Sequence, residues 1–164
     1  MDGLFEIIKK QAVELSEFME NEALQIIEVE TLNHIEESYE NEGFTDESLV
    51  KWKPRKTTDK RGKDKTRYRT NRRGKQGDLT RFGKKNKDRK TLTGHGSGGN
   101  KLRHSWHAEK GNGSVHFAND KEYAEAHNEG TDKLPKRKQA GKSKVLDQAI
   151  KKRIDNNINK ILKR

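Results

Sequence analysis

Residues 4–42 read "LFEIIKKQAVELSEFMENEALQIIEVETLNHIEESYENE" and carry the strongest structural signal in the chain. Apolar residues recur there every three or four positions, at Ile8, Ala12, Leu15, Met19, Ala23 and Ile26 and then at Val29, Leu32 and Ile35. This spacing predicts one face of a helix, and no Pro or Gly interrupts it before Gly43. About 36 residues at ~1.5 Å each would span ~54 Å. An acidic helix of this length is typical of one that packs on a neighbouring subunit or crosses a sheet.

A second amphipathic helix is predicted at the other end of the sequence, from about residue 143 to residue 163. Its apolar positions are Leu146, Ile150, Ile154, Ile158 and Ile161. Ser143 is a candidate N-cap, and the Lys and Arg residues of the last turn suit the helix dipole. We expect Ile150, Ile154 and Ile158 to be buried against a sheet.

A β-hairpin is predicted between the two helices. Residues 102–109 and 114–118 alternate in polarity, and Gly111-Asn112-Gly113 between them is a turn sequence. His104 and His107 would then lie on one strand and point to opposite faces of the hairpin, because their spacing is odd.

The segment after the hairpin predicts a short helix and then an extended stretch. Asn119 or Asp120 would cap the helix, and Gly130 would end it in the left-handed conformation. Pro135 follows in "KLPKRK", which could form an edge strand. The expected fold class is α+β, with long terminal helices around a small antiparallel sheet.

Residues 51–100 differ in composition from the rest of the chain. They contain many Lys and Arg residues and almost no aliphatic side chains, so they bury too little apolar surface to order themselves alone. We expect an extended basic arm anchored by Trp52, Tyr68 and Phe82. The chain thus divides into an acidic helix (1–50), this arm (51–100) and a C-terminal part (101–164), within one domain.

The charge is distributed unevenly along the chain. Only 27% of residues are hydrophobic, 38% are charged, and the net charge is +11. Residues 1–50 hold 14 Asp/Glu and 2 Lys/Arg, whereas residues 51–110 hold 5 and 22, and residues 111–164 hold 7 and 13. Such asymmetry favours contact with nucleic acid or contact between oppositely charged subunit surfaces.

Several classes of protein are disfavoured by the sequence. There is no cysteine, which excludes disulfides and thiolate metal sites. No signal peptide or membrane-spanning stretch is recognisable, so we expect a soluble protein without a membrane partner, first present in a cytoplasm.

The histidines are the natural starting point for an enzyme interpretation. His95, His104, His107, His116 and His127 lie within 33 residues but show no metal-ligand spacing. His127-Asn128 invites comparison with His-Asn-His nucleases, yet no second His follows on the last helix. The Gly-rich residues 93–100 lack the Lys-Ser/Thr of a phosphate loop. The sequence therefore predicts no catalytic residues, no metal and no cofactor.

A set of residues in the C-terminal half matches a known pattern. The pattern has a Trp before a long basic insertion, a Thr-Gly and Leu-Arg-x-Ser segment, a Tyr-Ala-x-x-His-x-x-Gly element, a Pro-x-Arg turn, a Gly-x-Ser and a terminal helix. The matching residues are Trp52, Gly94, Leu102, Arg103, Ser105, Tyr123, Ala124, His127, Gly130, Pro135, Arg137 and Gly141. On these positions, residues 91–162 resemble the virion morphogenesis or tail completion proteins of Mu-like and related tailed phages.

The resemblance implies a structural virion protein of the head–tail junction or upper tail. Such proteins form rings, typically of six copies, next to connector, tail-tube or tail-terminator proteins, with genomic DNA in the lumen. A nucleic-acid-binding protein using residues 51–110 stays open as the alternative. Under either hypothesis the residues expected to contact a partner or DNA are Lys51, Lys53, Arg55, Arg67, Arg69, Arg72, Arg73, Lys84 and Lys85.

Overall fold

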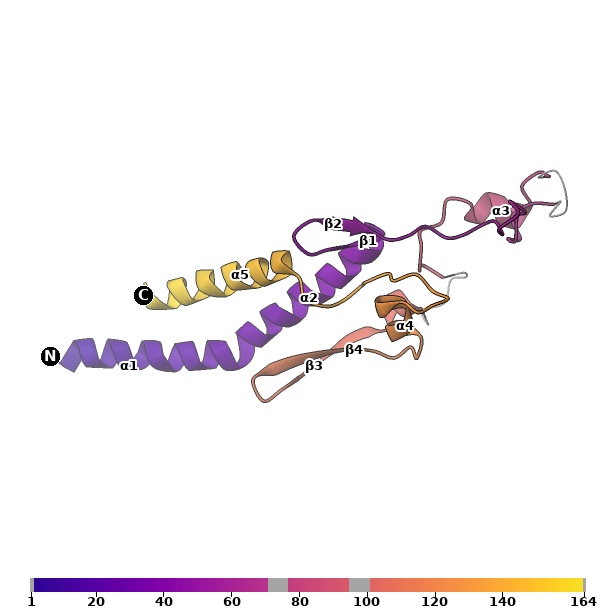
Figure 1. Ribbon diagram of the computed structural model, residues 1–164. Helices are drawn as coiled ribbons and strands as arrows, with labels where there is room; N and C mark the ends of the chain where they lie inside the picture. The colour runs from indigo at the N-terminus through magenta and orange to yellow at the C-terminus, as the bar shows by residue number, and fades with distance from the viewer. Residues whose placement is uncertain (1, 71–76, 95–100, 164) are drawn as a thin grey trace.

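The computed structural model describes residues 2–70, 77–94 and 101–163. It is α+β, as the sequence predicts, and it contains a long N-terminal helix, two small antiparallel hairpins and a C-terminal helix. The molecule is elongated, with the N-terminus at one end and the segment around α3 (Arg81–Asn86) at the other (Figure 1).

The predicted long helix is confirmed, but it is not uniform. It consists of α1 (Asp2–Glu17), a π-helical turn (Phe18–Glu22) and α2 (Ala23–Glu40). In the π-turn the N–H of Ala23 donates to the carbonyl of Phe18, five residues back, so the helix accommodates one additional residue. The ribbon changes direction between α1 and α2 (Figure 1), as expected at a π-bulge.

The π-turn explains why the predicted apolar stripe is wrong at Met19. The additional residue shifts the helical phase, so that Phe18 and Ala23 are buried while Met19 is exposed. Ile8, Ala12 and Val29 are exposed as well; Leu15, Ile26 and Leu32 are half-buried, and Ile35 is buried. A pattern with a constant 3.6-residue repeat cannot anticipate this shift.

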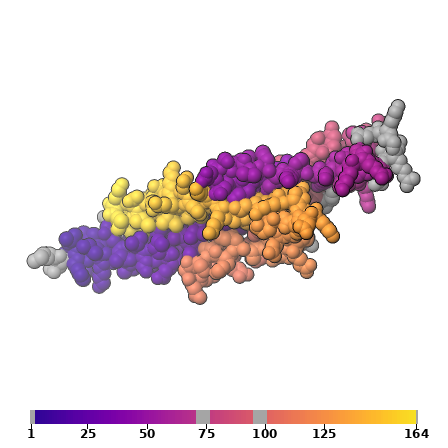
Figure 2. Space-filling view, in the orientation of Figure 1, coloured from indigo at the N-terminus to yellow at the C-terminus, as the bar shows by residue number. Residues whose placement is uncertain are grey.

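The C-terminal helix α5 (Lys144–Leu162) forms as predicted, with Ser143 as its N-cap. The Ser143 hydroxyl accepts from the N–H of Leu146 at 3.1 Å and donates to the carbonyl of Thr45 at 2.8 Å. The expected packing partner is wrong, however, because α5 lies along α2 and α1 rather than on a sheet (Figure 2). Ile150, Ile154 and Ile158 are consequently only half-buried.

The predicted hairpin is confirmed with a later start. Strands β3 (Trp106–Gly111) and β4 (Ser114–Asn119) pair antiparallel, and Gly111 lies opposite Ser114. The two-residue turn has positive φ at both Asn112 (49°) and Gly113 (73°), as a type I′ turn requires. Leu102–His104 form a 3-10 turn instead of extending the strand, so His104 and His107 do not share a strand.

A second hairpin was not predicted. Strands β1 (Gly43–Thr45) and β2 (Leu49–Lys51) pair antiparallel directly after α2. A Cβ on Gly43 would lie 2.7 Å from the carbonyl oxygen of Val50, so Gly43 permits close strand pairing in addition to ending the helix. Three-residue strands leave too short an alternation to be recognised in a sequence.

The short helix α4 (Ala124–Glu129) is present, but neither Asn119 nor Asp120 caps it. Gly130 follows it with φ 80°. The expected edge strand around Pro135 does not form: this stretch is extended without ladder pairing, and Arg137 N–H donates to the carbonyl of His127 at 2.8 Å.

The hydrophobic core is small and lies where all parts of the chain meet. Ile35, Tyr39, Trp52, Leu102 and Ala124 form it, and Leu92, Trp106 and Ala140 pack against its edge. The rings of Tyr39 and Trp52 meet edge to face, with centroids 5.6 Å apart. Each segment predicted from composition thus contributes to one core, which makes the body of the protein a single unit.

Candidate binding surfaces

Many of the residues that carry the family resemblance are structural. Trp52, Leu102 and Ala124 belong to the core, and Trp52 also donates its indole N–H to the carbonyl of Lys138 at 2.8 Å. Ser105 donates to the carbonyl of Lys101 at 2.9 Å. These contacts give Trp52, Leu102, Ala124 and Ser105 structural roles in this chain.

Arg103 joins the segment before β3 to α2. Its guanidinium donates to both carboxylate oxygens of Glu36, at 2.8 and 2.9 Å, and also binds Glu40. Hydrogen bonds from Lys90 and from Arg103 hold the pKa of Glu40 below its usual value. The planar guanidinium fork suits this paired geometry, so Arg103 is a structural clamp.

Three of the glycines and the proline have conformational roles. Gly94, Gly130 and Gly141 have positive φ, of 65°, 80° and 137°. At Gly130 a Cβ would also lie 2.8 Å from the backbone nitrogen of Lys136, so the turn after α4 requires glycine. Pro135 stiffens the extended stretch that follows.

The remaining residues of the pattern surround a cavity of about 360 Å³. Its lining combines basic, aromatic and aliphatic side chains. They come from Arg55, Thr91, Leu92, Gly94, Lys101, Leu102, Tyr123, His127 and Arg137. The ring of Tyr123, the residue before α4, meets the ring of His127 on α4 edge to face, with centroids 5.9 Å apart.

Arg137 and His127 give this cavity its electrostatic character. Arg137 is 8% exposed, and its Nε donates to the carbonyl of Lys53 at 3.1 Å. Burial, and secondarily the charge of Arg55, lower the pKa of Arg137. Burial, and then Arg137, lower the pKa of His127. The Nδ1 atom of His127 is buried and has no hydrogen-bond partner.

The basic arm is folded locally where the structure describes it, which differs from the expected extended chain. Thr80 caps α3 by accepting from the N–H of Gly83 at 2.9 Å, and its hydroxyl donates to the carbonyl of Arg67 at 2.9 Å. Tyr68 contacts Phe82, with ring centroids 5.9 Å apart. Of the three predicted anchors, Trp52 belongs to the core. Phe82, another of them, is 41% exposed.

The basic residues predicted to contact partners have different environments. Arg55 donates to the hydroxyl of Tyr68 at 2.9 Å, and Arg69 donates to the carbonyl of Gly77 at 2.9 Å and lies 3.9 Å from Asp64. The other described members are exposed: Lys51, Lys53, Arg67, Lys84 and Lys85. Arg72 and Arg73 lie outside the described residues.

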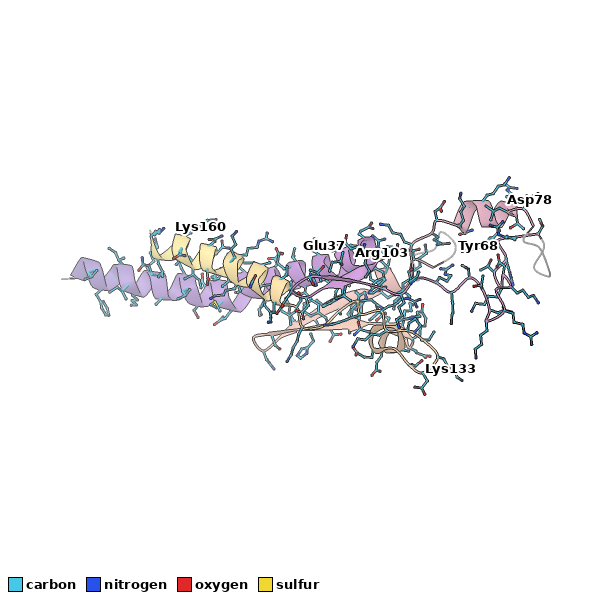
Figure 3. All side chains as sticks on the ribbon, turned by 45° about the horizontal axis from the view of Figure 1, so that its top comes forward. Glu37, Tyr68, Asp78, Arg103, Lys133 and Lys160 are labelled. Atoms are coloured by element: carbon cyan, nitrogen blue, oxygen red, sulfur yellow. The ribbon has the colours of Figure 1, made fainter. Side chains whose placement is uncertain are left out.

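The acidic face of α2 is largely neutralised within the subunit. Four of its glutamates form ion pairs with basic residues of the same chain. The pairs are Glu28–Lys110, Glu30–Arg153, Glu36–Arg103 and Glu40–Lys90. Figure 3 shows Glu37 and Arg103 near the middle of the molecule, with Tyr68 and Asp78 at the arm end. The described bases without an ion pair include Lys53, Arg67, Lys84 and Lys85 in the arm, and also Lys151, Lys152 and Lys160 on α5, which packs along α1 and α2.

The free end of α1 carries a second surface, of which the predicted apolar stripe included only Ile8. Gln11 donates to the carbonyl of Leu162 at 3.3 Å, so the turns before Gln11 extend past the end of α5 (Figure 1). Leu4 and Phe5 are each 67% exposed, and Ile7 and Ile8 are more than half exposed. We call these four residues the apolar tip.

No metal-binding cluster is found among the described residues. In residues 2–70, 77–94 and 101–163, no group of three or more His, Asp or Glu side chains is placed to hold a metal ion. No helix in the same ranges is long and apolar enough to cross a membrane. His95 lies outside them, and His34, which no sequence motif singles out, is buried against Phe44.

Comparison of the chain with protein-family models, curated proteins and solved structures finds no match. What the protein does is therefore inferred from its own residues: from the motifs that carry the resemblance and from three surfaces, the apolar tip, the basic arm and the cavity beside α4.

Proposed function

We propose that the protein is a non-catalytic structural component of a tailed-phage virion, at the head–tail junction or in the upper tail, where copies of the chain form a ring. The family resemblance supplies the place in the virion. The observation that supports assembly is the apolar tip, because four neighbouring apolar side chains at the end of a helix are costly to leave in water.

The charge distribution supports association between unlike ends of two copies. α1 carries four acidic and two basic residues, with Lys9 and Lys10 directly after the apolar tip, whereas the arm at the opposite end is strongly basic. Contact between one copy's tip and the next copy's arm would use two different surfaces. Such heterologous contacts generate a ring when the rotation between copies closes.

A comparison of the free energy gained by burying the tip with the free-energy cost of association favours a closed assembly over a simple dimer. The four side chains of the tip are 52–67% exposed, so burying the remaining surface contributes roughly 4–7 kcal/mol. Association costs about 4–15 kcal/mol in lost freedom. A single contact of this kind is therefore marginal, whereas in a ring every copy takes part in two contacts.

Sedimentation velocity of the full chain tests this proposal. The unmodified protein should form an oligomer, and the combined variant Leu4→Ser, Phe5→Ser should sediment as a monomer with unchanged circular dichroism. A matched control is Leu49→Ser with Val50→Ser, which changes two exposed apolar residues of β2. If the tip variant still forms the same oligomer, the tip is not the contact.

The alternative function, nucleic-acid binding through residues 51–110, is favoured by the exposed bases of the arm. Lys53, Arg67, Lys84 and Lys85 form no ion pair with any described residue. Phosphate contacts made by such bases would be independent of sequence and would weaken steeply with salt.

Deleting residues 55–90 separates the roles of the arm. We expect rings or their attachment to neighbouring virion proteins to fail, because the arm is proposed to contact the next copy. Particles that assemble normally but lose DNA retention or delivery would show instead that the arm faces DNA. A monomer whose DNA affinity falls steeply with salt would favour the nucleic-acid-binding alternative outright.

A further inference from the structure

The cavity beside α4 has the features of a binding site for an anion. We propose that it binds a carboxylate group presented by another polypeptide, with Arg137 as the principal ligand and Arg55 and His127 beside it. The site is separate from the apolar tip and from the outer bases of the arm, and it requires no particular oligomer.

The first argument is charge. Arg55, Lys101 and Arg137 line the cavity, and no Asp or Glu is among its lining residues. Arg137 is more than nine-tenths buried, yet no described carboxylate forms an ion pair with it. A buried cation without a counter-ion is unfavourable, and an incoming carboxylate would supply the missing partner.

The second argument is hydrogen bonding. Among the described residues Arg137 uses Nε on a backbone carbonyl, which leaves its terminal nitrogens for the fork that binds carboxylates in a bidentate manner. His127 also lines the cavity, and its buried Nδ1 atom has no hydrogen-bond partner. Tyr123 and Leu102 provide apolar walls suited to the methylene stem of a Glu side chain.

The third argument distinguishes a carboxylate from a nucleic-acid phosphate. The phosphates of duplex DNA lie along a backbone on the outside of a wide helix, and exposed Lys and Arg side chains reach out to contact them. Arg137 is buried beneath the surface and held by the carbonyl of Lys53. A carboxylate on a flexible side chain or at a chain end can enter a recess of this size, whereas a duplex backbone cannot.

Peptide titration of the full chain tests the proposal, with the ring protons of His127 followed by NMR. Two probes are used: a peptide of residues 11–22 of this chain, which contains four Glu residues, and an unrelated Glu-rich peptide of the same length. Either should bind and raise the pKa of His127, because a carboxylate beside the imidazole favours its charged form. Stronger binding by the first peptide would identify a second copy as the source; equal binding would identify any acidic segment.

The variants assign the binding to the cavity. Arg137→Gln should weaken peptide binding at least about tenfold, as expected when one partner of a desolvated charge pair is removed. Because that variant also alters a buried contact, Arg55→Gln provides a second test at the rim, with a smaller weakening. Lys133→Gln, which removes an exposed charge outside the cavity, is the matched control and should change nothing.

Three results would contradict the assignment of the cavity as a carboxylate site. The proposal is wrong if neither peptide shifts the His127 resonances, or if Lys133→Gln weakens binding as much as Arg137→Gln does. Inorganic phosphate or a short DNA duplex that binds more tightly than both peptides, with the same dependence on Arg137, would reassign the cavity to phosphate. Since these measurements do not depend on oligomer formation, their failure would leave the ring proposal to its own sedimentation test.

Discussion

Tyr39→Phe should destabilise the protein far more than the loss of one oxygen atom suggests. The Tyr39 hydroxyl donates to Oε1 of Gln139 at 2.8 Å and accepts from the indole N–H of Trp106 at 3.2 Å. Tyr39 and Gln139 are fully buried. Burial raises the pKa of the Tyr39 hydroxyl, so this group is neutral at physiological pH.

The expected magnitude follows from the groups left unpaired. Removing the hydroxyl leaves a buried amide oxygen and a half-buried indole N–H without this hydrogen-bond partner. Each fully buried polar group left unpaired lowers the free energy of unfolding by about 1–3 kcal/mol. Since Trp106 can partly reach solvent, we expect a loss of about 2–4 kcal/mol in the free energy of unfolding. For a chain of this length each kcal/mol corresponds to roughly 2–4 °C in Tm.

Urea unfolding followed by circular dichroism measures this effect. The matched control is Tyr123→Phe, because that side chain is 48% exposed and its hydroxyl can be hydrated; we expect a change below about 0.5 kcal/mol. Equal effects of the two substitutions would refute the hydrogen-bonded core that joins α2, β3 and the segment before α5.

Three other changes follow from the structure. The pKa of His127 lies below its ordinary 6.5 because of burial and Arg137, so near pH 6.5 the unfolded chain binds a proton that the native state does not. Tm should therefore fall as the pH decreases from about 7 to about 5.5. His127→Asn should reduce this dependence of Tm on pH in a series of thermal melts. Ser143→Ala removes the N-cap of α5 and should cost about 1–2 kcal/mol in urea unfolding, whereas no change would show that the cap is dispensable. Gly83→Ala would place a Cβ 2.0 Å from the carbonyl oxygen of Tyr68, so faster proteolysis of the arm is expected, and an unaltered digestion pattern would contradict that packing.

Long periodic elements were predictable because their signal is local. Ser143 and the apolar spacing after it determine α5, and Asn112-Gly113 determines the β3–β4 turn, since each depends on neighbours in the sequence. The long first helix was predictable for the same reason. The buried face of this helix was not predictable around Phe18, because the π-turn there shifts the helical phase and no residue type in the sequence indicates a π-turn.

The sites depend on contacts between distant residues and were less accessible to prediction. Arg137 and His127 were selected from the sequence as parts of a motif, but nothing local indicates that Arg55 approaches them or that no carboxylate does. Likewise the exposure of Phe5 depends on where α5 ends relative to α1. Such facts follow from packing, which composition and periodicity do not encode residue by residue.

The central claim, that this chain builds a ring, is tested most directly by native mass spectrometry of the purified full-length protein, with negative-stain electron microscopy of the same sample. We expect one closed stoichiometry, retained at about 0.5 M salt because the apolar tip contributes to each contact, and annular particles in the images. A monomer at all concentrations, or an open series of masses without a preferred copy number, would contradict the claim.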